Sequence, residues 1–167
     1  MTLDRIWNGW RAQYVNESGG RVPGEEGSLF TQILSCGLDD EETHIIHRGP
    51  LVFVILNAFP YTSGHLMVLP YREISDLEDL TVDEATELWA TVTEAVVAVK
   101  AAYRPGGVNV GINLGRAAGG SISEHLHVHV VPRWSGDGNF MTSVAEARTL
   151  PEPLSHSAAK LREAWRR

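Results

Sequence analysis

Residues 125–131 read HLHVHVV, in which histidines alternate with apolar side chains up to Pro132. Successive side chains of a β-strand point to opposite faces, so the pattern predicts a strand with His125, His127 and His129 on one face. The leucine and valine side chains of the other face belong in a core. The histidine face must then look into a pocket or toward solvent, and it carries most of the chemical information in the sequence.

The rest of the sequence predicts an α+β fold around this strand. Thr81 is a good helix N-cap, and apolar residues recur behind it at helical spacing as far as the turn at Pro105, which predicts one long helix. Strand-like runs lie before and after this helix, and the short connection 58–64 permits an antiparallel pair. We expect a mostly antiparallel sheet of about five strands, over residues 43–48, 51–57, 65–71, 108–114 and 125–131.

The length of 167 residues predicts a single domain, 1–167, with an extension at each end. Residues 1–28 comprise an amphipathic helix expected over residues 2–15 and a turn-rich loop. Residues 141–167 form the second extension, in which a last helix is expected over residues 155–167.

The composition is that of an ordinary globular protein, with 43% hydrophobic and 21% charged residues. The formal net charge of −7 excludes nucleic-acid binding by bulk attraction, because that mode needs a basic surface. The single cysteine, Cys36, excludes an intramolecular disulfide and a Cys-x-x-Cys pair. The first ten residues lack a secretory-signal pattern, and polar residues and prolines interrupt the charge-free stretch between Arg48 and Arg72. We expect a cytoplasmic protein without nucleic-acid or membrane partners.

The histidine face has three interpretations. The first is a solvated strand face without chemistry. The second is a metal site, but His125 and His129 lie ~13 Å apart along an extended strand, too far to share one zinc ion. That interpretation needs two of the three histidines together with a distant ligand such as His65. The third is nucleophilic catalysis at phosphorus.

Nucleophilic catalysis suits the central residue, His127. A histidine is largely neutral at neutral pH and carries a lone pair, and its phosphoryl adduct is energy-rich enough for a second acceptor to attack. A neighbouring histidine can hydrogen-bond the phosphate oxygens or protonate the leaving oxygen. His127 has such a neighbour on each side.

The sequence resembles the histidine-triad superfamily, whose motif of three alternating histidines residues 125–131 match without exception. The resemblance extends over roughly residues 43–140. It includes Asn57 at a strand end eight positions before His65. It is closest to an actinobacterial diadenosine tetraphosphate phosphorylase branch, because of the segments HLHVHVVPRW (125–134), GDGNF (136–140), NLG (113–115) and AGGS (118–121).

The resemblance implies a role for each residue of the motif. His127 attacks the α-phosphorus and becomes nucleotidylated, His129 hydrogen-bonds the phosphate or bridging oxygen, and His125 supports their orientation. His65 is the fourth histidine of the pocket, and Asn57 holds the ribose hydroxyls. The residues implied to line the phosphate path are Asn113, Gly120, Ser121 and Trp134. A strand-end cap at Asn57 and ordinary packing of Trp134 remain open alternatives.

Two departures from related sequences bear on metal and mechanism. Many relatives carry a Cys-x-x-Cys pair that helps bind structural zinc, where this chain has Ser28, Leu29, Phe30 and Thr31. We therefore expect no structural zinc, and His44 and His47 are expected to be strand residues. The phosphate loop lacks the glutamine or asparagine of several hydrolases, which favours phosphate over water as the second nucleophile.

The implied reaction converts diadenosine tetraphosphate and phosphate to ATP and ADP through a nucleotidyl-histidine. The alternatives are a dinucleoside polyphosphate or nucleoside phosphoramidate hydrolase, and a non-catalytic nucleotide-binding module. We expect no covalent cofactor, and magnesium only as a companion of the polyphosphate. The resemblance also implies a homodimer through the long helix and a sheet edge, with Trp89 as a candidate interface residue and a tetramer left open.

Overall fold

The computed structural model describes residues 27–118, 122–138 and 152–165. The helix expected over residues 2–15 lies outside these ranges. The described elements are, in chain order, α2 (Leu29–Ser35), α3 (Asp40–Thr43), β1 (Ile45–Arg48), β2 (Val52–Leu56), β3 (Leu66–Pro70), η1 (Leu77–Asp79), α4 (Val82–Tyr103), β4 (Gly107–Ile112), η2 (Arg116–Ala118), β5 (Val128–Arg133) and α6 (Leu154–Trp165).

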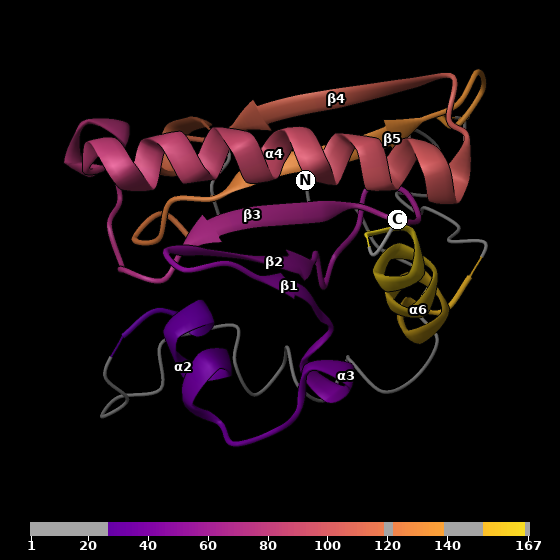
Figure 1. The fold of residues 1–167 in the computed structure, drawn as a ribbon. Coiled ribbons are helices and arrows are strands. Elements are labelled where there is room, and N and C mark those ends of the chain that lie inside the picture. The colour runs from indigo at the N-terminus through magenta and orange to yellow at the C-terminus, as the bar shows by residue number, and fades with distance from the viewer. Residues whose placement is uncertain (1–26, 119–121, 139–151, 166–167) are drawn as a thin grey trace.

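Five antiparallel strands form one sheet in the order β1-β2-β3-β5-β4. The last strand in the sequence thus pairs between β3 and β4, and β4 lies at the edge. Figure 1 shows α4 along one face of this sheet, with α6 near the end of α4 that leads into β4. The predicted α+β class and antiparallel sheet are confirmed.

The alternating strand residues divide between two cores. On the α4 side, buried strand residues pack against Leu88, Val92, Ala95 and Val99 of α4 and against α6. These strand residues are Val52, Val54, Leu56, Leu66, Val68, Val128 and Val130. On the opposite face, Phe30 of α2 packs with Phe53, Ile55, Met67 and Leu69. His129, the one histidine of β5, belongs to this second face.

The long helix begins where the sequence predicts. The Thr81 hydroxyl accepts the Glu84 backbone N–H, and the Glu84 carboxylate accepts the Thr81 N–H in return, which is a capping box. Arg72 also holds this carboxylate, at 2.8 Å, and its hydrogen bonds lower the pKa of Glu84 to about 2. None of the described helices is long and apolar enough to cross a membrane.

The chain before β1 differs from the prediction of a strand over residues 43–48. Residues 40–43 form the short helix α3, which Asp39 caps, and β1 begins only at Ile45. His44, expected to be a strand residue, ends α3 in the left-handed conformation with φ 60°. The acidic side chains of the capping box outweigh the apolar pattern of the following residues here.

The predicted strand 125–131 is shifted toward the C-terminus. β5 runs from Val128 through Pro132 to Arg133, so His125 and His127 precede the paired strand. Pro132 is tolerated because β3 pairs only with residues 128–130 of β5, which leaves one neighbouring strand at the proline. The Thr62 hydroxyl donates to the carbonyl of Pro132, which lies beyond the residues of β5 that pair with β3.

Candidate active site

The four histidines named from the sequence meet on the face of the sheet opposite α4. His129 lies in β5, opposite Met67 of β3 and Gly111 of β4. His125 and His127 precede β5, and His65 directly precedes β3. All four side chains are buried, and the rings of His127 and His129 lie 4.8 Å apart in an edge-on arrangement.

A backbone carbonyl fixes the proton of His127. Nδ1 of His127 lies 2.8 Å from the carbonyl oxygen of His125. A carbonyl only accepts, so Nδ1 carries the proton and Nε2 carries the lone pair. Burial lowers the pKa of His127, which keeps the ring neutral. His127 is therefore held in the protonation state that a nucleophile requires.

A second chain of hydrogen bonds fixes the proton of His129. The backbone N–H of Tyr61 donates to Nδ1 of His65, at 3.1 Å, so His65 is protonated at Nε2. The Nε2–H of His65 donates to Nδ1 of His129, at 2.9 Å, which leaves the proton of His129 on Nε2. Nε2 of His129 is buried and has no hydrogen-bond partner among the described residues. Such a donor is suited to an oxygen of a bound substrate.

The environment of His129 opposes its protonation. Burial, followed by the neighbouring His127, lowers the pKa of His129 to about 4. At neutral pH it is a neutral hydrogen-bond donor, since an imidazolium would need to lose water of hydration inside the protein. His129 therefore offers an uncharged Nε2–H donor.

His125 is anchored at both ring nitrogens by groups outside this pair. Nε2 lies 2.9 Å from the carbonyl oxygen of Pro70, and Nδ1 lies 2.7 Å from the hydroxyl of Ser28. Burial lowers the pKa of His125 as well. Phe30, two residues after Ser28, packs against the rings of both His125 and His127. No pattern in the sequence predicted that Ser28 and Phe30 support His125.

A cavity of about 520 Å³ opens beside His129. The polar residues around it include Tyr61, Thr62, Asn109, Asn113 and Arg133. Tyr61 also packs its ring against His65, at 4.6 Å between ring centroids. The volume lies in the range of small-molecule sites. The lining also includes Asp137, whose carboxylate pairs with Arg133. The buried N–H of His129 beside this cavity suits a ligand with oxygen acceptors.

The remaining predicted site residues have different places in the structure. Asn113 lines the cavity. Asn57 caps the strand end, because its Oδ1 accepts the Phe59 N–H at 2.8 Å. Its amide nitrogen lies 3.5 Å from Nε2 of His65, a weak contact since that atom is already a donor. Trp134 packs edge-on against Tyr103. Gly120 and Ser121 lie outside the described residues.

The sequence around Ser28 does contain a local signal, that of a helix N-cap. A serine followed by Leu29 and Phe30 and by further apolar residues at helical spacing is an N-cap pattern, and Ser28 is the N-cap of α2. The contact between Ser28 and His125 spans 97 positions of the chain, which no local pattern reports.

The described residues contain no group of three or more histidine, cysteine or acidic side chains placed to hold a metal ion. Ser28 and Thr31, which stand where relatives carry cysteines, have hydroxyls 3.2 Å apart. Neutral hydroxyls are poor ligands for zinc, which prefers thiolate, imidazole and carboxylate. Ser28 and Thr31 therefore supply poor zinc ligands, and the carboxylate beside them, that of Glu73, accepts hydrogen bonds from both residues.

These histidines define a protein of the histidine-triad class. The family model of the HIT domain matches residues 39–136, and the chain belongs to that family.

Individual relatives differ in their sequence identity to this chain and in how much of it they cover. It is 46% identical over 169 residues to a protein of Mycobacterium tuberculosis named AP-4-A phosphorylase, covering 99% of this chain and 86% of the relative. It is 32% identical over 95 residues to the asymmetrical bis(5'-nucleosyl)-tetraphosphatase of Schizosaccharomyces pombe, covering 57% of this chain and 52% of the relative. A Zn-bound histidine triad family protein from Mycobacterium smegmatis superposes with a TM-score of 0.68 at 28% identity, covering 84% and 94% of the two chains.

Proposed function

We propose that this chain is a nucleotidyltransferase that cleaves diadenosine tetraphosphate with inorganic phosphate to give ATP and ADP. The observation that carries the proposal is the pairing of a lone pair on Nε2 of His127 with an N–H on the neighbouring His129. The near full-length similarity to the mycobacterial AP-4-A phosphorylase supports this choice of reaction.

In the first step, Nε2 of His127 attacks the α-phosphorus of one adenosine. A P–N bond forms, the bond from phosphorus to the bridging oxygen breaks, and ATP leaves with the electron pair. The Nε2–H of His129 donates to the oxygen on which charge accumulates. The His125 carbonyl, 2.8 Å from Nδ1 of His127, stabilises the positive charge that the ring acquires when Nε2 bonds to the α-phosphorus.

In the second step, an oxygen of inorganic phosphate attacks the same phosphorus. The P–N bond breaks, its electron pair returns to Nε2 of His127, and ADP is released. One slow displacement is thus divided into two faster ones, with AMP held on the enzyme between them.

The test is covalent loading. Diadenosine tetraphosphate labelled at the α-phosphorus is incubated with the protein without phosphate, and label on the denatured protein is counted. We expect label on the unaltered protein and none on His127→Ala. A His127→Ala variant with unaltered turnover would refute the mechanism, and saturable AMP binding without any covalent label would indicate a binding module.

A hydrolase that uses water is the second candidate, since the tetraphosphatase of S. pombe is a relative. Chromatography of the products with and without phosphate separates the two reactions. We expect ADP to form only when phosphate is present, and with water AMP is released in its place. Turnover that is independent of phosphate would establish the hydrolase.

We propose the ribose-binding role for Asn57 and the phosphate-path role for Asn113, Gly120, Ser121 and Trp134. The position of Asn113 on the cavity supports its role. Asn57→Ala is expected to raise the KM for the dinucleotide more than Trp134→Phe does. Equal KM values for Asn57→Ala and the unaltered protein would contradict the assignment.

We also propose that the protein needs no structural zinc and no covalent cofactor, and that magnesium accompanies the polyphosphate. The Ser28 hydroxyl and Nδ1 of His125 form a hydrogen bond with each other, which supports the absence of structural zinc. Metal analysis of the purified protein should find zinc well below one equivalent. A stoichiometric zinc content, lost together with activity on chelation, would refute it.

We propose a cytoplasmic homodimer that pairs through α4 and the edge strand β4. Trp89 of α4 is 48% exposed and Val110 of β4 is 43% exposed, which supports a covered surface there. Sedimentation should give twice the monomer mass, and Trp89→Glu with Val110→Glu should give the monomer. A monomeric unaltered protein would remove the dimer and leave the chemistry unaffected.

A further inference from the structure

The segment from His125 to His127 lies outside the sheet, so strand pairing does not hold the nucleophile. The pairing of β5 with β3 and with β4 begins at Val128. The position of His127 must therefore depend on other contacts. Two of these are the hydrogen bond from Leu126 N–H to the Ile74 carbonyl, at 2.6 Å, and the anchoring of the His125 ring.

Each hydrogen bond around the His125 ring has one possible direction. Nε2 faces the carbonyl of Pro70, so it carries the proton, and Nδ1 of the neutral ring must accept. The Ser28 hydroxyl is therefore the donor in the 2.7 Å contact with Nδ1. Ser28 and His125 are 2% and 1% exposed, so water does not readily replace this hydrogen bond.

Glu73 holds Ser28 in the position from which it donates. Its Oε2 accepts the backbone N–H of Ser28 at 2.6 Å and the hydroxyl of Thr31 at 2.9 Å. Because the Thr31 proton is directed to Glu73, it does not compete for Ser28, whose own proton remains directed to His125. The backbone N–H of Thr31 donates to the Ser28 oxygen, at 3.3 Å, and completes its geometry.

We infer that Ser28 and Glu73 are positioning residues for the nucleophile, acting through His125 on His127. The His125 ring and its own carbonyl are parts of one residue, and that carbonyl accepts Nδ1–H of His127. A change in the ring's anchoring therefore moves the acceptor that orients the nucleophile. The inference rests on the proposed function, and it adds the start of α2 to the residues on which the reaction depends.

The test compares Ser28→Ala, Glu73→Ala and the double variant. Ser28→Ala leaves a buried acceptor without its donor, and we expect kcat to fall about 10-fold or more while KM changes little. Glu73→Ala is expected to have a smaller effect of the same kind. In the Ser28→Ala background, Glu73→Ala should add almost nothing, because its route to His125 is already broken.

Glu78→Ala is the matched control, since Glu78 is an exposed carboxylate nearby on η1. It should keep the kcat of the unaltered protein. Unaltered kcat in Ser28→Ala, or multiplicative effects of Ser28→Ala and Glu73→Ala, would overturn the inference. Should Ser28→Ala not fold, the exposed Glu73 provides the deciding variant, and unaltered kcat in Glu73→Ala would then overturn it.

A measurement without turnover separates this inference from the proposed function. In ¹⁵N NMR of the histidine-labelled protein, the Nδ1 resonance of His125 should move on Ser28→Ala, and that of His127 should move with it. An unmoved His127 resonance would overturn the inference even if phosphorolysis is confirmed. Absence of phosphorolysis in the unaltered protein would refute the proposed function and leave this result standing.

Discussion

At the scale of single residues, two backbone groups decide where the protons of the site lie. The His125 carbonyl places a proton on Nδ1 of His127, and the Tyr61 amide, acting through His65, places one on Nε2 of His129. The result is an acceptor on one ring and a donor on the next. Neither assignment follows from the order of histidines in the sequence.

The donor role of His129 predicts unequal effects of two substitutions. His129→Leu removes the N–H, and we expect the rate of ATP release in the absence of phosphate to fall about 100- to 1000-fold. His129→Gln keeps an N–H donor of similar reach and should lose less. Rapid-quench measurement of a single turnover provides both rates. Equal rates for the leucine and glutamine variants would contradict the donor role.

The nucleophile predicts the acid side of the pH profile. Protonation of Nε2 removes the lone pair of His127, so activity is lost as the pH falls through the pKa of His127. Burial lowers this pKa from its ordinary value of 6.5, which moves the loss to more acidic pH. Single-turnover ATP release between about pH 5 and pH 8 should show its acid limb below 6.5. An acid limb above 7 would contradict this assignment.

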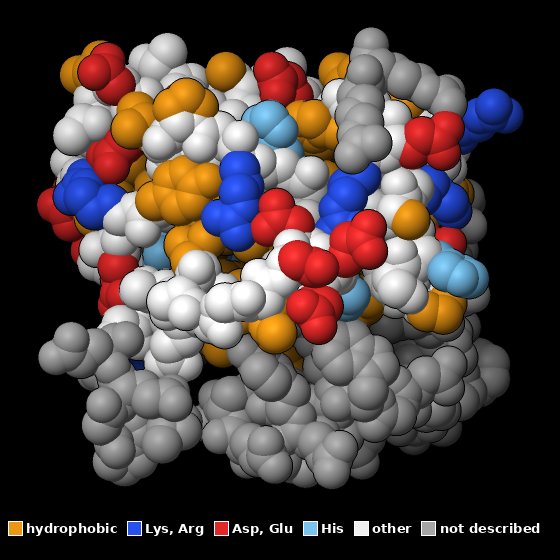
Figure 2. All heavy atoms as spheres, turned by 60° about the horizontal axis from the view of Figure 1, so that its bottom comes forward, with side chains coloured by type: hydrophobic (Ala, Val, Ile, Leu, Met, Phe, Trp, Pro, Cys, Tyr) orange, Lys and Arg blue, Asp and Glu red, His pale blue; other side chains and the backbone are white. Residues whose placement is uncertain are grey.

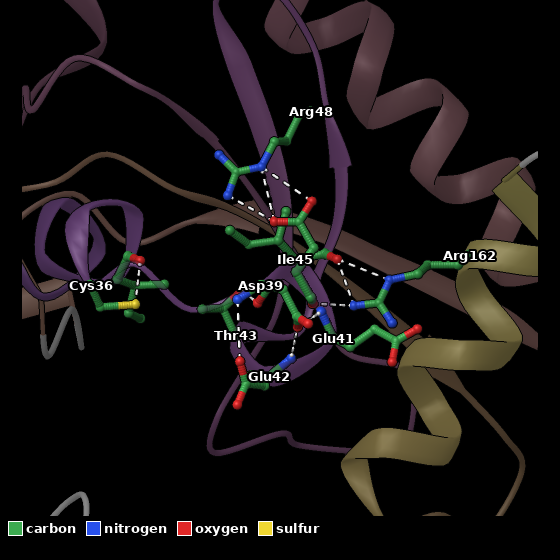
Figure 3. Close-up of polar contacts among 10 residues, drawn as sticks. Cys36, Asp39, Glu41, Glu42, Thr43, Ile45, Arg48 and Arg162 are labelled. Carbon is green, nitrogen blue, oxygen red and sulfur yellow. Dashed lines mark hydrogen bonds and ion pairs between the residues drawn. The ribbon is translucent and has the colours of Figure 1, made fainter.

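At the scale of elements, two arginines link β1 to the helices α3 and α6. Figure 3 shows Arg162 of α6 reaching the carbonyl oxygen of Ile45. Arg48 pairs with the side chain of Asp40. Arg162 also donates to the Asp40 carbonyl. Around these elements, the face in Figure 2 carries acidic side chains interspersed with basic ones.

These two arginines predict different losses of stability. Arg162→Ala removes charged hydrogen bonds to buried or half-buried carbonyls, and we expect the free energy of unfolding to fall by about 1.5–3 kcal/mol. Arg48→Ala breaks an ion pair whose side chains are 39% and 44% exposed, and should cost about 0–1 kcal/mol. Urea unfolding measures both. An equal loss for the two variants would contradict the anchoring role of Arg162.

The elements also show what the sequence can predict. The long helix was predictable because Thr81, Glu84 and the apolar spacing all specify it locally. The bounds of the last strand were predicted incorrectly because alternation continues through His125 and His127, although pairing begins at Val128. Side-chain alternation reports an extended backbone and does not report where a neighbouring strand ends.

At the scale of the whole molecule, three neutral histidines in one interior make stability depend on pH. Burial lowers the pKa of His125, His127 and His129, the last to about 4. Below the ordinary pKa of 6.5 the unfolded chain takes up protons that the folded chain does not. The free energy of unfolding therefore decreases as the pH decreases. Each such histidine contributes a slope of at most about 1.4 kcal/mol per pH unit in that window.

Urea unfolding at about pH 7 and pH 5 measures this dependence. His129→Gln should lose less stability between the two pH values than the unaltered protein does, because one of the buried titrating groups is gone. His156, which is exposed on α6, provides the control. His156→Gln should keep the full dependence, and an equal reduction in both variants would contradict the assignment to the buried cluster.

The site itself was predictable only in part. Its histidines were identifiable because three of them lie close together in the sequence, and His65 followed from the resemblance to a family. Ser28, Phe30 and Tyr61 were not identified. Ser28 and Phe30 meet the histidines only because segments far apart in the chain fold together. The Tyr61 amide reaches His65 within one loop, four residues away, and the conformation of that loop decides the contact. Which of the two nitrogens of each ring carries a proton depends on those same partners.

The place of β5 in the sheet has a consequence for synthesis of the chain. β3 and β4 each need β5 as a neighbour, yet β5 follows them both in the sequence. A nascent chain that has not yet emerged past Arg133 therefore exposes two unpaired strand edges, and such edges promote association between chains. Ribosome-bound intermediates of this protein should thus depend on chaperones until β5 emerges, and the nucleophile should be set in place late in folding.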